Sequence, residues 1–76
     1  MSAVQFLTRS GCLLCSESLP VVAAGAARRR HVFEVVDVDQ PGWQERYGER
    51  VPVVLRDGVE VLSGRFDARD VRRALR

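Results

Sequence analysis

Lysine is missing from this sequence, and all twelve of its basic residues are arginines. Ten acidic residues oppose them, which leaves a formal net charge of only +2, and aromatic residues make up 7% of the chain. Nucleic-acid-binding modules carry a clustered basic face with aromatic platforms, whereas most of these arginines are scattered among the acids. We therefore expect no nucleic-acid partner.

Cysteine is also scarce, with two residues in the chain, and the sequence holds a single histidine, His31. Two cysteines are too few for the disulfide scaffold of a small secreted domain. A structural zinc site takes four ligands, so an intramolecular site would need carboxylates in addition to the cysteines and His31. A metal site is accordingly an alternative in which two chains share their cysteine pairs around zinc or an iron–sulfur cluster.

Long hydrophobic runs are absent as well. The longest nearly apolar segment, residues 19–27, is about half of a membrane span. The N-terminal residues 1–7 lack the basic segment and the long apolar stretch of a signal peptide. We expect a cytoplasmic protein with no membrane partner.

The composition that remains is that of a globular protein, with 46% hydrophobic and 29% charged residues in a chain of 76. This length allows one small domain over residues 1–76, because domains below about 50 residues rarely stand alone. We expect a thin hydrophobic core. We also expect the protein to be a monomer.

The pattern of apolar residues predicts seven short elements in the order β-α-β-α-β-β-α. The strands are expected over residues 3–7, 32–38, 53–56 and 59–62, and the helices over residues 13–29, 41–47 and 68–75. Asp57 and Gly58 form the two-residue turn of an antiparallel hairpin between the last two strands. The first two strands, separated by a helix, should pair in parallel through a right-handed crossover. The fold class is therefore α/β with a four-stranded mixed sheet.

Local signals refine the prediction around the first helix. Pro20 removes one backbone hydrogen bond and should kink this helix, whereas the arginines at 28–30 suit the negative end of its dipole. The strand over residues 32–38 is rich in β-branched residues and is expected to be buried on both faces. His31, at the corner before it, is expected to be a solvated loop residue.

The later helices also carry local signals. Asp39 or Gln40 is expected to cap the short second helix, and Asp67 to cap the last one. Trp43 and Tyr47 stand four residues apart on the second helix, a spacing that favours a packing pair over a ligand platform.

The residues that carry chemistry are the pair in Cys12-Leu13-Leu14-Cys15, placed where a loop enters a helix. The unpaired N–H groups and the positive dipole end of a helix N-terminus favour an anion, so the pKa of Cys12 should be lowered. Cys15 lies one turn later on the same face, where it can attack a mixed disulfide formed at Cys12. This position predicts that Cys12 is a nucleophile and Cys15 a resolving thiol. The alternatives are two cysteines that merely pack in the core, or the shared metal site.

The chain resembles the thioredoxin superfamily, and most closely its small glutaredoxin-like proteins, over nearly its whole length. The resemblance rests on residues 8–15 (Thr-Arg-Ser-Gly-Cys-Leu-Leu-Cys), on Pro20, on Val51-Pro52 and on residues 63–67 (Ser-Gly-Arg-Phe-Asp). It implies a thioredoxin-like fold of the glutaredoxin type with a cis peptide bond before Pro52, beside the active site. The backbone of Val51 would then pair with an incoming peptide or with glutathione.

The same resemblance bears on glutathione. Family members that bind it carry a basic residue three positions before the nucleophile, where this chain has Arg9. They also carry a Gly-Gly turn before an aspartate at a helix start, which Gly64 and Asp67 match in part, with Ser63 in place of the first glycine. The Leu13-Leu14 pair departs from the usual Pro-Tyr. Two alternatives remain: Arg9 is merely a solvated side chain, and Asp67 is no more than a helix cap.

The resemblance and the dithiol motif together predict a thiol–disulfide oxidoreductase that reduces protein or glutathione mixed disulfides. It would need no metal or organic cofactor, with glutathione as a candidate co-substrate. Its partners would be a protein disulfide client and an external thiol reductant, either glutathione or a system of the thioredoxin reductase type. The alternative is a metal-binding or interaction module on the same fold without redox turnover.

Overall fold

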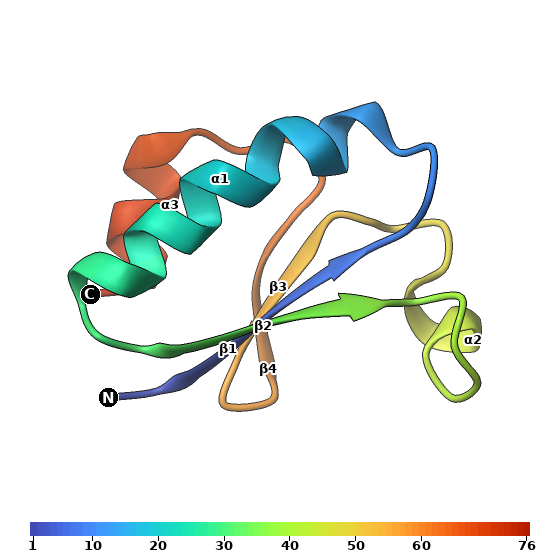
Figure 1. Cartoon of the computed structure of the whole chain (residues 1–76), viewed down its shortest axis with the longest axis horizontal. Coiled ribbons are helices and arrows are strands. Elements are labelled where there is room, and N and C mark those ends of the chain that lie inside the picture. The colour runs from blue at the N-terminus through green and yellow to red at the C-terminus, as the bar shows by residue number, and fades with distance from the viewer.

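The computed structural model describes residues 1–76, and its four strands form one mixed sheet in the order β2-β1-β3-β4 (Figure 1). The strands are β1 (Ala3–Thr8), β2 (Val32–Asp37), β3 (Val53–Arg56) and β4 (Val59–Ser63), and the helices are α1 (Leu13–Arg28), α2 (Gln44–Tyr47) and α3 (Ala68–Ala74). β1 pairs in parallel with β2 and antiparallel with β3, which pairs antiparallel with β4. The predicted element order and mixed sheet are confirmed.

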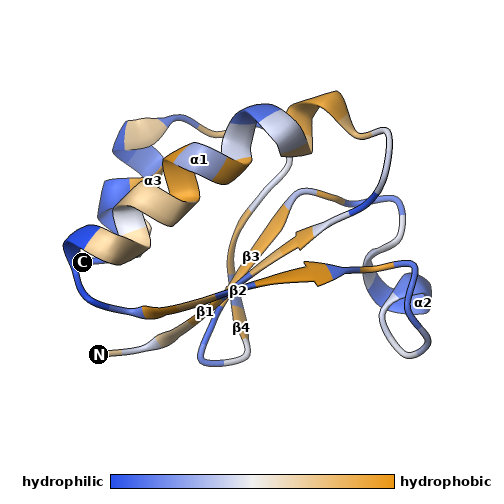
Figure 2. Cartoon of the chain, viewed as in Figure 1, coloured by the Kyte–Doolittle hydropathy of each residue, from blue (hydrophilic) through white to orange (hydrophobic).

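The larger core lies between the sheet and the two longer helices, α1 and α3, which cover the same face of the sheet (Figure 1). Alternate residues of β1 and β3 point toward these helices. The buried side chains that meet there are Val4, Phe6, Cys15, Val22, Ala26, Val54, Val71 and Leu75. In Figure 2 the strands are accordingly hydrophobic over much of their length, while the ends of α1 and α3 near the C-terminus are hydrophilic.

The opposite face of the sheet carries a smaller core beside α2. Its buried members are Leu7, Val36, Val38, Tyr47, Val53 and Leu55. Trp43 packs against this cluster, and its ring centroid lies 6.0 Å from that of Tyr47. The predicted packing pair is therefore confirmed.

The prediction that the second strand is buried on both faces was wrong. Val32 of β2 is 58% exposed and Val35 is 48% exposed. β2 lies at the edge of the sheet, and α2, with only 4 residues, covers just one end of the second face. The β-branched residues of this segment correctly predicted a strand, but they do not indicate where in the sheet the strand lies.

Gly25 of α1 lies against Val71 and Leu75 at the end of α3. A Cβ atom built at this position would lie 2.5 Å from Cγ1 of Val71, closer than two carbon atoms can pack. Gly25 therefore allows a contact between α1 and α3 that a larger residue could keep only if Val71 or the helices shifted. α1 has 16 residues and runs through Pro20. None of the helices combines the length and the apolar content that crossing a membrane requires.

His31 is not the solvated loop residue that the sequence predicted. Its Nδ1 accepts a hydrogen bond from the N–H of Ser2 at 3.0 Å, and its Nε2 lies 2.7 Å from the carbonyl oxygen of Leu75. A ring nitrogen that accepts from an N–H carries no proton, so Nε2 must be the protonated nitrogen that donates to Leu75. His31 thus joins the start of β1 to the end of α3.

The expected caps of the two shorter helices had different outcomes. α2 begins at Gln44 without a side-chain cap, so the prediction that Asp39 or Gln40 caps it was wrong. Asp39 instead pairs with an arginine of another segment. Asp67 does cap α3: its side chain accepts from the N–H of Asp70, and the Asp70 side chain accepts from the N–H of Asp67 in return. This reciprocal arrangement is a capping box.

The hairpin turn between β3 and β4 lies where the sequence placed it. Asp57 and Gly58 have φ values of +52° and +84°, the two positive values that a tight hairpin turn requires. Asp57 Oδ1 also accepts a hydrogen bond from the N–H of Ala3 at 2.9 Å. This hydrogen bond, with help from Ser2, lowers the pKa of Asp57 below its usual value of 3.8. The hairpin turn is thereby tied to the start of β1.

Gly25→Ala tests the contact between α1 and α3. Alanine normally stabilises a helix interior by about 1 kcal/mol relative to glycine, but overpacking costs about 1–3 kcal/mol. We expect a net destabilisation of about 1 kcal/mol in urea unfolding. In a Val71→Ala background the obstructing methyl group is gone, so the same change should be neutral or stabilising. An equal loss in both backgrounds would contradict the close contact.

Asp57→Asn tests the carboxylate at the hairpin turn, because asparagine tolerates the same positive φ but does not titrate. A carboxyl group whose pKa is lowered by folding stabilises the protein above pH 3.8, and this contribution is lost as the pH falls through the folded-state pKa. Thermal unfolding at pH 6 and pH 3 should therefore show a smaller acid-induced loss in the variant than in the parent. Glu49→Gln, at an exposed carboxylate that belongs to neither ion pair, should behave like the parent.

Candidate active site

The dithiol motif lies where the chain leaves β1 and enters α1. Gly11 has a φ of +80°, a conformation that glycine adopts without strain, and it turns the chain into the helix. Cys12 is the N-cap of α1, with extended backbone angles, and Cys15 is in the first turn. The sequence therefore delivers both thiols to the start of the longest helix, as predicted.

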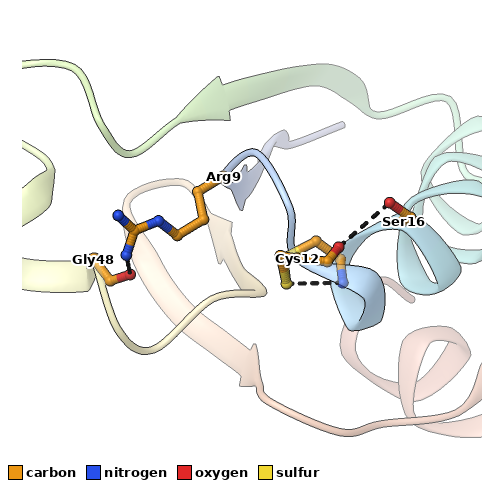
Figure 3. The surroundings of a disulfide bond; sticks show 5 residues. Arg9, Cys12, Ser16 and Gly48 are labelled. Carbon is orange, nitrogen blue, oxygen red and sulfur yellow. Dashed lines mark hydrogen bonds between the residues drawn. A yellow bond between two sulfur atoms is a disulfide. The ribbon is translucent and has the colours of Figure 1, made fainter.

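The two cysteines form a disulfide in the structure, with their Cα atoms 5.2 Å apart. This separation lies within the range of about 4.4–6.8 Å that bridging requires. Cys12 Sγ also accepts a hydrogen bond from the N–H of Cys15 at 3.1 Å, and the Cys12 carbonyl accepts one from the Ser16 hydroxyl at 3.3 Å (Figure 3). Cys12 is half-buried, whereas Cys15 is 1% exposed and belongs to the larger core. Only Cys12 can be reached by another molecule.

The surroundings of Cys12 favour negative charge on sulfur. The N–H groups of Leu13 and Leu14 make no intramolecular hydrogen bond, and the first turn of α1 contains no acidic residue. Unpaired N–H groups at a helix start carry the positive end of the helix dipole. A thiolate at Cys12 would therefore be stabilised by these groups and by the N–H of Cys15.

Val51, Pro52 and Gly64 meet at the end of the sheet from which the Cys12 loop departs. The pairing places Leu7 of β1 opposite Val53, and Val53 opposite Ser63. The Val51–Pro52 peptide bond is cis, which confirms the geometry that the resemblance implied. The Pro52 carbonyl accepts from the N–H of Gly64 at 2.8 Å, whereas the N–H and C=O of Val51 have no hydrogen-bond partner. Val51 therefore offers one free donor and one free acceptor.

Arg9 points away from Cys12 and is held by other groups (Figure 3). Its guanidinium donates to the carbonyl oxygen of Gly48 at 2.6 Å and to Asp39 Oδ1 at 3.0 Å. Arg9 is therefore not a merely solvated side chain, because it ties the loop before Cys12 to the end of α2. The sequence could not reveal these partners, which stand 30 and 39 residues away along the chain.

Asp67 lies at the start of α3, beside the middle of α1. Ala68, the next residue, lines the same hollow as Val21 of α1, more than two helical turns beyond Cys12. The pKa of Asp67 is lowered, chiefly because its carboxylate accepts the N–H of Asp70. Phe66 packs against the same core as Cys12 and Val51, and no pattern in the sequence singles it out. Leu13, in contrast, is 74% exposed at the mouth of the site.

The side chains near the dithiol do not form a metal site within one chain. No group of three or more histidine, cysteine, aspartate or glutamate side chains is close enough to hold an ion. Cys12 and Cys15 would supply two of the four ligands that structural zinc takes, so a metal site would require residues from a second chain.

Comparison with known proteins agrees with this geometry. The model of the Glutaredoxin-like domain family matches residues 3–76. Uncharacterized proteins of Mycobacterium tuberculosis and Mycobacterium bovis are 35% identical over 63 residues, which cover 75% of this chain and 65% of theirs. The chain thus spans less than two thirds of the length of these relatives.

Two solved structures share the fold. A structural-genomics target protein from X. campestris is 32% identical, with a TM-score of 0.75 over 93% of this chain and 92% of its own. Thioredoxin 1 from Thermosipho africanus is 22% identical, with a TM-score of 0.72 over 95% of this chain and 88% of its own, and it shows the fold alone. The disulfide-forming pair on this fold supports a redox-type thiol function. The chain belongs to the glutaredoxin-like domain family.

Proposed function

We propose that this protein is a thiol–disulfide oxidoreductase that reduces protein or glutathione mixed disulfides. The observation that carries the proposal is the asymmetry of the cysteine pair. Cys12 is accessible at the start of α1 among unpaired N–H groups, while Cys15 is buried one turn later within bonding distance. A nucleophile needs access and a stabilised thiolate, whereas a resolving thiol needs only to reach the first sulfur.

The reaction starts from the reduced dithiol. The Cys12 thiolate attacks one sulfur of the substrate disulfide, a bond forms between them, and the other substrate sulfur leaves as a thiolate that takes a proton from solvent. Cys15 then loses its proton to solvent and attacks Cys12 Sγ. The Cys12–Cys15 disulfide forms and the second substrate thiol is released. Two electrons have moved from the protein to the substrate, and an external thiol returns them.

Groups around Cys12 are suited to hold a polypeptide substrate. The free N–H and C=O of Val51 can pair with the backbone of an extended segment, as the family resemblance implies. The exposed side chain of Leu13 offers an apolar contact beside the reacting sulfur. Gly64, hydrogen-bonded to the Pro52 carbonyl, leaves the surface next to Val51 free of a side chain.

The position of Arg9 bears on the identity of the reductant. Glutathione presents carboxylates, and Arg9 could bind one only by giving up its hydrogen bonds to Gly48 and Asp39. Asp67 is likewise engaged in a capping box. This arrangement favours another thiol protein over glutathione as the reductant, in a reducing compartment such as the cytoplasm.

Variants of the two cysteines test the mechanism. Cys12→Ala should abolish disulfide reduction, since the nucleophile is gone. Cys15→Ala should still form a mixed disulfide at Cys12 but fail to release it, so that the adduct accumulates and is seen by mass spectrometry. In this variant, the rate at which iodoacetamide alkylates Cys12 should rise with pH and reach its midpoint below about 8.5, the usual pKa of a free thiol.

Other results would contradict the proposal. A Cys15→Ala protein that forms no adduct would show that the roles are wrong. Stoichiometric zinc or iron in protein purified without chelators, protecting both thiols from alkylation, would favour the metal-binding alternative.

Arg9→Gln separates a structural role of Arg9 from a role in glutathione binding. The variant loses a charged donor to the buried carbonyl of Gly48, so we expect a destabilisation of about 1 kcal/mol in urea unfolding and little change in the KM for glutathione. Asp39→Asn, which weakens only the half-exposed ion pair, should cost less. A tenfold rise in this KM with unchanged stability would place Arg9 in a glutathione site instead.

A further inference from the structure

Four arginines converge at the end of α1 opposite to Cys12. Two come from the C-terminal end of α1 and two from the C-terminal end of α3, which are more than 40 residues apart in the sequence. They surround a hollow with a volume of about 180 Å³, lined by Gly25, Arg28, Arg29, Arg72, Leu75 and Arg76. We term it the arginine hollow. The close approach of the helices at Gly25 is what brings the two pairs together.

None of these four guanidinium groups has a partner within the chain. Arg9 and Arg50 form ion pairs, and Arg56 donates to a hydroxyl and a carbonyl. No ion pair or side-chain hydrogen bond is formed by Arg28, Arg29, Arg72 or Arg76, because all of those made by arginine side chains belong to Arg9, Arg50 and Arg56. Like charges held close together repel each other, so a bound anion would relieve the repulsion.

The helix dipoles alone do not account for so much positive charge at one place. Each helix C-terminus carries about half of a negative charge, so the two ends together offset about one of the four arginines. The remaining charge faces a concave surface in which the backbones of the two helices are fixed by Gly25, Val71 and Leu75. Figure 2 shows the hydrophilic ends of α1 and α3 lying near each other at this end of the molecule.

We propose that the arginine hollow binds a small phosphorylated anion carrying a diphosphate group. Arginine presents a planar set of donors that binds phosphate oxygens in pairs. The volume of about 180 Å³ accommodates one or two phosphoryl groups and falls below the roughly 300–1,000 Å³ of pockets that enclose drug-sized ligands. No aromatic side chain lines the hollow, so it lacks the stacking surface with which proteins hold single-stranded nucleic acids.

This site is separate from the dithiol. α1 has 16 residues and is therefore about 24 Å long, with Cys12 at one end and the arginine hollow at the other. Occupation of the hollow would not block access to Cys12. The proposal does not depend on the redox function, and a binding measurement tests it without an activity assay.

Titration with inorganic pyrophosphate at constant ionic strength tests the proposal. Calorimetry should give saturable binding of one pyrophosphate per chain, and the amide NMR signals of Gly25 and Leu75 should shift while those of Cys12 and Cys15 do not. Arg72→Gln should weaken binding by about tenfold or more, because one charged donor is lost. Arg73→Gln is the matched control, since the next residue of the same helix is also exposed but does not line the hollow. It should weaken binding by less than twofold.

Three results would overturn the proposal. Binding that does not saturate, or that both variants weaken equally, would show diffuse attraction to positive charge instead of a site. Binding of a single-stranded oligonucleotide without binding of pyrophosphate would show that the arginines recognise a chain of phosphates. Urea unfolding of both variants checks that they fold, which we expect because neither side chain has a partner in the chain.

Discussion

The packing of α1 against β1 and β3 determines where the two cysteines lie. Cys15, Val22 and Ala26 are buried on the side of α1 that faces Phe6 and Val54 of the sheet. Because Cys15 belongs to this core, the first turn of the helix cannot rotate without exposing apolar surface to water. The N-cap position, and with it Cys12, is therefore held at the rim of the core. Burial of one cysteine fixes the exposure of the other.

The pairing of the sheet adds the second half of the site. β1 leads to Cys12, and its antiparallel neighbour β3 begins immediately after Pro52, so that the end of one strand and the start of the other share an edge. Antiparallel register thus brings residues about 40 positions apart to one side of the sheet. The unpaired backbone groups of Val51 lie there because β3 has not yet begun and no other strand reaches them.

The features that the sequence predicted correctly are those that depend on neighbouring residues. Asp57-Gly58 specifies a tight turn through its own backbone preferences, and Asp67 caps the helix that follows it. Two cysteines three residues apart come close together wherever the segment between them is helical. The resemblance to a known family supplied the cis bond at Pro52, which no local pattern would have favoured over trans.

The features that the sequence missed depend on where distant segments meet. The residues around His31 in the sequence do not indicate that it joins Ser2 to Leu75. Those around Arg9 do not indicate that its hydrogen-bond partners are Gly48 and Asp39. The exposure of β2 follows from its place at the sheet edge, which composition does not encode. The convergence of arginines from α1 and α3 likewise exists only in three dimensions.

The hydrogen bonds of Arg9 have a mechanical consequence for the two segments that carry Cys12 and Val51. One guanidinium clamps the loop before Cys12 to the carbonyl of Gly48, three residues ahead of Val51. Cys12 Sγ and the free backbone groups of Val51 are thereby held at a preset spacing by a single side chain. A polypeptide that binds there meets a surface already assembled, so less of the binding free energy is consumed in ordering loops.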